Sequence, residues 1–391
     1  MNSEIKKSSK KKLLLQRNLR WIVLLIILAL STGLGVIHQL FRNLRTINVD
    51  QLCPFGALES LYAYFRTGQL IARVGVSSFI LMIFVVLVTI LFRRAFCGHF
   101  CPLGTLQEIF DRLGRKVFKK RLVVPEVLDR PLRLGKYIVL ILIVGFSWYF
   151  GRLIIRPYDP WAAYHHLTSH ELFDEFLIGF LILVFSLFFS FLYQRFFCKY
   201  LCPLGGFVAF LAPIGMTTIH RHAETCTQCL ACDKICPVNI KVSQMDKVTS
   251  LECIQCHECV NVCPVKNTLV IKISGRKKIR SSHVIAVILA IYLLLVGLST
   301  LSGHFHWIQP NLAKQAQQAQ KRGAVLDPEN ITGRMTLQEV VEAYDIPQEV
   351  FSSRFQLESD DFNIPLRDME AVSTGDLRVF VKEYLDQVQK P

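Results

Sequence analysis

The chain has 391 residues, a formal net charge of +15 and a hydrophobic fraction of 52%. Its mean hydropathy of +0.36 is too high for a soluble protein of this length. The charge is unevenly placed, because residues 302–391 hold 9 Lys and Arg against 14 Asp and Glu, or −5, while the remainder has 36 against 16, or +20. This asymmetry indicates an orientation in a membrane rather than a nucleic-acid surface.

The chain begins with a basic segment, residues 1–20, followed by an apolar run from residue 21 to about residue 40. A run of that length can cross the ~30 Å hydrocarbon core of a bilayer. A cleaved signal peptide is the alternative, but no small-x-small cleavage site closes the run. Further apolar runs predict spans at residues 70–92, 134–154, 172–193 and 279–301. We therefore expect a mainly α, polytopic membrane protein with about five spans.

Basic residues gather on one side of the predicted spans. Residues 93–133, between the second and third spans, contain many Lys and Arg, whereas the loops after the first and third spans are nearly balanced. By the positive-inside rule, residues 1–20 and 93–133 face the cytoplasm of a bacterial inner membrane, and residues 302–391 lie outside. Basic stretches also bind RNA, but each one here abuts an apolar span. The expected partner is therefore the lipid bilayer and not nucleic acid.

The apolar half of the chain contains an internal repeat. The same pattern occurs twice, as Phe96-Cys97-Gly-His-Phe-Cys101-Pro-Leu-Gly and as Phe197-Cys198-Lys-Tyr-Leu-Cys202-Pro-Leu-Gly. An earlier pair, Cys53-Pro-Phe and Asp159-Pro-Trp, aligns with nearly the same offset. We expect residues 21–118 and 119–215 to be two parallel membrane repeats, related by a pseudo-twofold axis along the membrane normal.

Proline gives these motifs a local geometry. A residue before proline avoids the α region, whereas proline itself is favoured at the first helical position. Helices are therefore predicted to begin directly after Cys53, Cys101, Asp159 and Cys202. Because the free N–H groups of a helix start favour an anion, a lowered thiol pKa is expected there.

The two Cys-x3-Cys-Pro loops would meet at the inner membrane surface. We predict that Cys97, Cys101, Cys198 and Cys202 bind one further iron–sulfur cluster. A structural zinc ion, two labile thiol pairs and small packed cysteines are the alternatives that the sequence leaves open.

Residues 216–275 contain a stronger metal signal, a Cys-x2-Cys-x2-Cys-x3-Cys-Pro run written twice. This run binds cubane clusters in bacterial-type ferredoxins, where the fourth cysteine ligates the other cluster. One [4Fe–4S] cluster is assigned to Cys226, Cys229, Cys232 and Cys263. The second is assigned to Cys253, Cys256, Cys259 and Cys236. Zinc knuckles need ligands in two pairs, and dense disulfides are typical of small secreted proteins, so both fit poorly.

Histidines gather on the predicted outer side, at positions 38, 165, 166, 170, 304 and 306. A histidine in a quinone pocket could exchange protons with a bound quinol while electrons leave inward. Ordinary anchoring at the lipid headgroups is the alternative. His257, inside the tandem motif, is interpreted as an exposed residue or as a neighbour that tunes a cluster.

The acidic segment 302–391 is predicted to form a small helical domain outside the membrane, where a partner such as another subunit of a respiratory complex is expected to dock. Thr336-Leu-Gln-Glu339 is typical of a capping box that opens a helix. A second helix is expected near Pro347, and a third over residues 376–388, where apolar residues recur at helical spacing.

With the twin Cys-x3-Cys-Pro loops, the tandem cubane motif and the flanking spans, residues 20–300 or so resemble the NapH/NosR-type membrane polyferredoxins. The acidic tail lies outside the minimal NapH-like pattern. The resemblance implies an electron-transfer protein that passes electrons between quinol and other redox proteins, as a quinol dehydrogenase-type subunit. The alternative function is an iron–sulfur redox sensor or an assembly factor for a membrane respiratory enzyme.

Overall fold

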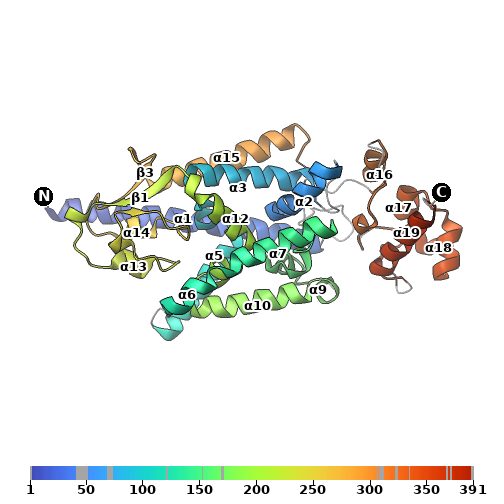
Figure 1. The fold of residues 1–391 in the computed structure, drawn as a ribbon, viewed down its shortest axis with the longest axis horizontal. Coiled ribbons are helices and arrows are strands. Elements are labelled where there is room, and N and C mark those ends of the chain that lie inside the picture. Colours follow the sequence, from blue (N-terminus) through green and yellow to red (C-terminus); the bar gives the residue numbers. More distant parts are fainter. Residues whose placement is uncertain are drawn as a thin grey trace.

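The computed structural model describes residues 2–40, 52–67, 74–119, 122–151, 153–168, 171–305, 307, 312–321, 325–333, 335–366, 369 and 372–388. Within this part the chain is mainly helical, and its long helices run side by side along the longest axis of the molecule (Figure 1). A small sheet lies at the end of the bundle near the N-terminus, and the last four helices lie at the other end (Figure 1).

Among the described residues, the first membrane half contains five helices, two of which cover its predicted apolar runs. They are α1 (Asn2–Leu40), α2 (Pro54–Thr67), α3 (Val76–Phe92), α4 (Ala95–His99) and α5 (Pro102–Phe118). The second half contains α6 (Glu126–Leu132), α7 (Gly135–Phe150), α8 (Pro160–His165), α9 (Glu171–Asp174), α10 (Leu177–Leu192), α11 (Phe196–Tyr200) and α12 (Pro203–Leu211). The two halves follow the same order of a long apolar helix, a one-turn helix and a helix that begins at proline.

In the part of the chain that the structure describes, three segments are long and apolar enough to cross a membrane, namely Asn18–Gln39, Glu126–Phe150 and Ser281–Leu301. The apolar helices α3 and α10 have 17 and 16 residues, somewhat fewer than the ~20 that a straight span requires. The third predicted span also begins earlier than expected. Its helix includes α6 and continues through a two-residue turn into α7.

Between α12 and α15 (Ser281–Leu301) the chain forms the tandem-motif domain. Its strands are β1 (Thr217–Arg221), β2 (Lys247–Val248), β3 (Leu269–Ile273) and β4 (Lys277–Ile279), and its helices are α13 (Ala231–Ile235) and α14 (Glu258–Val262). The sheet is antiparallel in the order β2-β1-β3-β4, with Ile219 opposite both Val248 and Ile271. Motif spacing did not predict this sheet.

One hydrophobic core joins the tandem-motif domain to the membrane helices. It contains Phe84 and Val88 of α3, Val284 of α15, Ile219 of β1 and Ile254 of the second cysteine loop, each 2% exposed or less. Because these side chains pack in one cluster, the domain is part of the end of the bundle near the N-terminus (Figure 1) rather than a separate body on a linker.

The C-terminal helices are α16 (Leu312–Gln320), α17 (Leu337–Tyr344), α18 (Gln348–Phe355) and α19 (Thr374–Val388). They enclose their own core around Leu337, Phe351 and Leu377, each fully buried. The capping box at Thr336 is present, with both of its hydrogen bonds to Glu339. An ion pair from Arg378 of α19 to Glu175, at 3.2 Å, connects this unit to the turn before α10.

Candidate functional site

The first candidate centre, which we call the twin-loop site, is formed by the four cysteines of the two Cys-x3-Cys-Pro loops, Cys97, Cys101, Cys198 and Cys202. The first cysteine of each loop lies in a one-turn helix, α4 or α11. The second is the N-cap of α5 or α12, and its sulfur accepts a backbone N–H, from Gly104 at 3.5 Å or from Gly205 at 3.2 Å. The predicted helix starts at the following prolines are therefore confirmed.

The four thiols of the two loops lie close enough to act on one another's charge. Nε2 of Gln107, in α5, donates to the sulfur of Cys198 at 3.2 Å. Burial, and then the nearby Cys198 and Cys97, raises the pKa of Cys101 to about 12. Burial and the other three thiols likewise raise the pKa of Cys202. The predicted lowering of these pKa values is wrong for the metal-free chain, because burial outweighs the one backbone N–H that each sulfur accepts.

The second candidate centre lies in the tandem motif, whose two triplets share one backbone shape. Gln228 and Leu230 in the first triplet, and Gln255 and His257 in the second, have positive φ between 50° and 61°. The two loops thus make the same tight turn at the same places. Successive backbone N–H groups in such a turn face a common point, which favours an anionic group.

The cysteines of the tandem motif fall into two groups, each with a member from the other run. One group lines a single cavity and consists of Cys226, Cys229, Cys232 and Cys263. The other is buried, its thiols close enough to act on one another's charge, and consists of Cys236, Cys253, Cys256 and Cys259. Burial raises the pKa of Cys253 to about 11 and that of Cys256 to about 12. Within the described residues, no three His, Cys, Asp or Glu side chains converge to hold a single metal ion.

The twin-loop site lies directly against the second group. A Cβ on Gly98 would lie 2.3 Å from the carbonyl oxygen of Ile254 and 3.1 Å from the backbone nitrogen of Cys256. The rings of His99 and His257 lie 5.1 Å apart in the same contact, each 1% exposed. Burial lowers the pKa of His257 to about 3, so this ring is neutral near pH 7. The interpretation of His257 as an exposed residue is therefore wrong.

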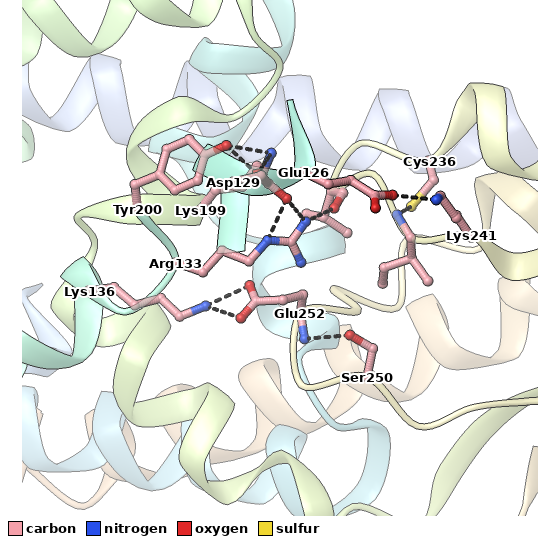
Figure 2. A network of polar contacts seen from close by, with 12 residues as sticks. Glu126, Asp129, Arg133, Lys136, Lys199, Tyr200, Cys236, Lys241, Ser250 and Glu252 are labelled. Atoms are coloured by element: carbon pink, nitrogen blue, oxygen red, sulfur yellow. Dashed lines mark hydrogen bonds and ion pairs between the residues drawn. The ribbon is translucent and has the colours of Figure 1, made fainter. Parts of the chain in front are cut away.

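A polar network ties α6 and α7 to the tandem-motif domain (Figure 2). Lys136 of α7 donates to Glu252, the residue before Cys253, at 2.5 and 2.6 Å. Arg133 donates to the carbonyl of Val238 at 2.9 Å and pairs with Asp129 of α6. Because the contacts to Glu252 and Val238 join residues more than 100 positions apart, they hold the cysteine loops in one place relative to the bundle.

A second network contacts the first loop of the twin-loop site. Glu108 of α5 accepts from Arg20 of α1 at 2.7 Å and from Arg195 at 2.8 Å. Burial opposes ionisation, but the two guanidinium groups hold the pKa of Glu108 down to about 2. Arg20 also donates to Glu258 at 3.1 Å and to the Gly98 carbonyl at 2.9 Å. Sequence reasoning missed these residues, although an arginine precedes the first cysteine by three positions in both repeats.

At the opposite end of the bundle, Asp159 caps α8 and accepts from the Trp161 N–H at 2.9 Å, as predicted. Of the six outer histidines, His170 and His306 lie outside the described residues. The rings of His38 and His166 lie 5.7 Å apart and are buried, as is His165. His304 is exposed and contacts Ser302.

A buried carboxylate, Glu59 of α2, lies at this same end of the bundle. It accepts from Ser147 at 2.5 Å and from the Ile155 N–H at 3.1 Å. Burial raises its pKa to about 7, and burial followed by the charge of Asp159 raises the pKa of Cys53. The spacing of the motifs did not indicate Glu59. The one signal in the sequence that could have identified Glu59 is the presence of a carboxylate in the helix predicted to begin after Cys53.

Comparison with protein families agrees with this geometry. A model described as a 4Fe–4S binding domain matches residues 74–121 and 176–219, so it covers both twin loops. A 4Fe–4S dicluster domain model matches residues 218–264. No solved structure matches the chain.

Among curated proteins, the chain is similar to YccM of Escherichia coli (strain K12), a candidate electron transport protein. The two sequences are 29% identical over 224 residues, which are 56% of this chain and 62% of YccM. The uncharacterised protein MJ0750 of Methanocaldococcus jannaschii is 32% identical over 49% of this chain and 76% of its own length. The ferredoxin-type protein NapH of E. coli is 26% identical over 52% of this chain and 67% of NapH. The chain thus spans less than two thirds of YccM. These matches, together with those to NirI and NosR, show that the chain belongs to the NapH/NosR-type 4Fe–4S membrane polyferredoxins, which are iron–sulfur electron-transfer proteins.

Proposed function

We propose that this protein passes electrons between the quinone pool of a bacterial inner membrane and a redox partner on the cytoplasmic side. Two cubane clusters would be held by the tandem-motif cysteines, one by Cys226, Cys229, Cys232 and Cys263, the other by Cys253, Cys256, Cys259 and Cys236. A third iron–sulfur cluster would be held by the twin-loop site. When bound, such a cluster carries one electron at a time at a potential set by its surroundings.

The residues of the three sites fit iron–sulfur clusters. All twelve are free thiols, the ligand type that holds iron–sulfur clusters. Burial raises the pKa of Cys101, Cys198 and Cys202, so binding needs positive charge to stabilise their thiolate forms. Iron and the buried cations around the loops would provide that charge.

The observation that carries the proposal is the contact between Gly98 and the Cys256 loop. Because no side chain separates the two backbones, the twin-loop site and the second cysteine group are neighbours. The first group lies farther out, where Cys229 is exposed and Leu230 is 46% exposed. A partner docking there would meet the cysteine group most accessible from solvent. The order twin-loop site, second group, first group therefore runs from the membrane to the surface.

At the outer end, His38, His166 and Glu59 are the candidates for a quinone pocket. A quinol gives up two electrons and two protons on oxidation. Glu59, with its pKa raised to about 7 by burial, can take up and release a proton near neutral pH. The basic segments support an orientation with the cysteine loops in the cytoplasm and residues 302–391 outside. The same residues serve the opposite direction, in which a cytoplasmic donor reduces quinone.

The test is the reduction of the protein by quinol in proteoliposomes, followed anaerobically by bleaching of the cluster absorbance. The proposal predicts bleaching by a quinol in the wild type and its loss in the Cys97→Ala/Cys198→Ala variant. Cys53→Ala is the matched control for iron content, because Cys53 belongs to none of the three sites. No reaction with quinol or quinone in the fully loaded wild type, together with a partner enzyme that fails to assemble after deletion, would support the sensor or assembly role instead.

A further inference from the structure

Two arginines occupy equivalent positions in the two repeats. Arg94 precedes Cys97 by three residues, and Arg195 precedes Cys198 by three residues. Both are fully enclosed, with 1% and 0% of their surfaces exposed. Basic residues near a membrane surface normally extend into the water or the headgroups. These two instead point into the protein, so their burial needs a local cause.

Each arginine reaches across to the opposite repeat. A Cβ on Gly104, at the start of α5, would lie 2.8 Å from Nη1 of Arg195. A Cβ on Gly205, at the equivalent place in α12, would lie 3.4 Å from Nη2 of Arg94. Nη1 of Arg195 also donates to the carbonyl of Cys97 at 2.5 Å. The side chains therefore cross, and each lies over the glycine whose N–H contacts a sulfur of the twin-loop site.

Both guanidinium groups act on the twin-loop thiols. Arg94 interacts electrostatically with Cys97 and Cys202. Arg195 interacts with Cys198 and Cys101. Every thiol of the site thus interacts with one of the two arginines. Each arginine acts on one thiol of its own repeat and on one thiol of the other repeat.

The carboxylates nearby do not balance the buried cations. Among the described residues, the cations exposed by 2% or less around the site are Arg20, Arg94, Lys136, Arg195 and Lys199. They pair with four carboxylates, Glu108, Glu252, Glu258 and Asp129. Five of these cations against four anions leave an excess of positive charge next to four thiols. An uncompensated buried charge is costly, so the arrangement favours an anionic group at the twin-loop site.

We propose that Arg94 and Arg195 are a crossed pair of positioning residues that compensate the negative charge of a thiolate-bound cluster in the twin-loop site and raise its reduction potential. This inference rests on the third cluster of the proposed function. A cation near a redox centre stabilises the form with the extra electron, so removing the cation makes the potential more negative.

The contacts of Arg195 require the planar shape of a guanidinium group. Its Nε and Nη2 both face Glu108, at 2.8 and 2.7 Å, while Nη1 holds the Cys97 carbonyl. Lysine has one nitrogen and cannot make these contacts together. Lysine does retain the charge, so comparison of Gln and Lys variants separates charge from shape.

The experiment is an anaerobic redox titration of the full-length protein in detergent, followed by EPR, with iron and sulfide measured on the same samples. The variants are Arg94→Gln, Arg195→Gln and the two corresponding Lys variants. Arg112→Gln is the matched control, because Arg112 of α5 stacks on Trp21, with its guanidinium carbon 3.4 Å from the ring centre.

The proposal predicts that one of three cluster signals moves to a more negative potential in each Gln variant and that the Lys variants lie closer to wild type. If a Gln variant loses the third cluster, the Lys variant is expected to retain it. Arg112→Gln is expected to leave all three potentials in place.

An unchanged set of potentials at full iron content would overturn the role of the arginines. So would an equal shift of all three signals, or an equal loss of the third cluster in the Gln and Lys variants. A wild-type protein with only about eight iron atoms, four for each of two cubanes, would instead refute the third cluster itself.

Discussion

The contact at Gly98 gives the sharpest prediction about how the membrane and tandem-motif cysteines are coupled. In Gly98→Ala, the new Cβ would lie 2.3 Å from the Ile254 carbonyl oxygen and within 3.2 Å of the Cys256 backbone. All the atoms met belong to backbone, so no side chain can rotate away. Relief of the clash requires the loops to part by about 1 Å, and overpacking of this kind costs about 1–3 kcal/mol.

We therefore expect Gly98→Ala to lower the free energy of unfolding by that amount and to slow the reduction of the tandem-motif clusters by quinol. Unfolding in detergent, followed by circular dichroism, measures the first effect, and stopped-flow absorbance measures the second. Gly145→Ala is the matched control, because Gly145 lies in a helix and nothing is within 4 Å of its added Cβ. If Gly98→Ala matched the control in both stability and rate, the close contact would have no role and the reasoning would fail.

Three further predictions follow from buried polar groups and from a helix cap. Glu108→Gln leaves Arg20 and Arg195 without their shared carboxylate. Chemical denaturation is expected to show that the free energy of unfolding falls by about 3–5 kcal/mol, and a fall below about 1 kcal/mol contradicts the network. The pKa of His257 falls from its ordinary value of 6.5 to about 3 on folding, because burial disfavours the charged ring. Between about pH 6.5 and 3 the unfolded metal-free chain therefore binds a proton at His257 that the folded chain does not, and the free energy of unfolding falls as the pH is lowered, by up to about 1.4 kcal/mol per pH unit. His257→Gln is expected to reduce this slope, and an unchanged slope counts against a buried neutral ring. Thr336→Ala removes the capping box of α17. The free energy of unfolding of the C-terminal helices, measured by thermal melting, is expected to fall by about 1 kcal/mol, whereas no change would show that the cap is dispensable.

Local rules predicted the features that depend on neighbouring residues. The helix starts after Cys101, Asp159 and Cys202 follow from the restrictions that proline places on its own backbone and on the residue before it. The capping box at Thr336 follows in the same way. These features survive in the structure because each is stabilised within one turn of chain.

The features that depend on distant residues could not be predicted. The basic composition of residues 93–133 predicts a cytoplasmic loop, but a tertiary contact with Glu252 buries Arg94 within it. The pKa of Cys101 was expected to fall because only its helix start was considered, and burial by the other repeat reverses the sign. The strands of the tandem-motif domain are 2 to 5 residues long, too short to leave a periodic pattern in the sequence.

The iron and sulfide content of the anaerobically purified full-length protein, combined with EPR under quinol titration, tests the central claim most directly. The account predicts about twelve iron atoms per chain, falling to about eight in Cys97→Ala/Cys198→Ala, and cluster signals that quinol reduces. Eight iron atoms in both proteins would remove the third cluster, and a spectrum without any reducible cubane would contradict the account as a whole.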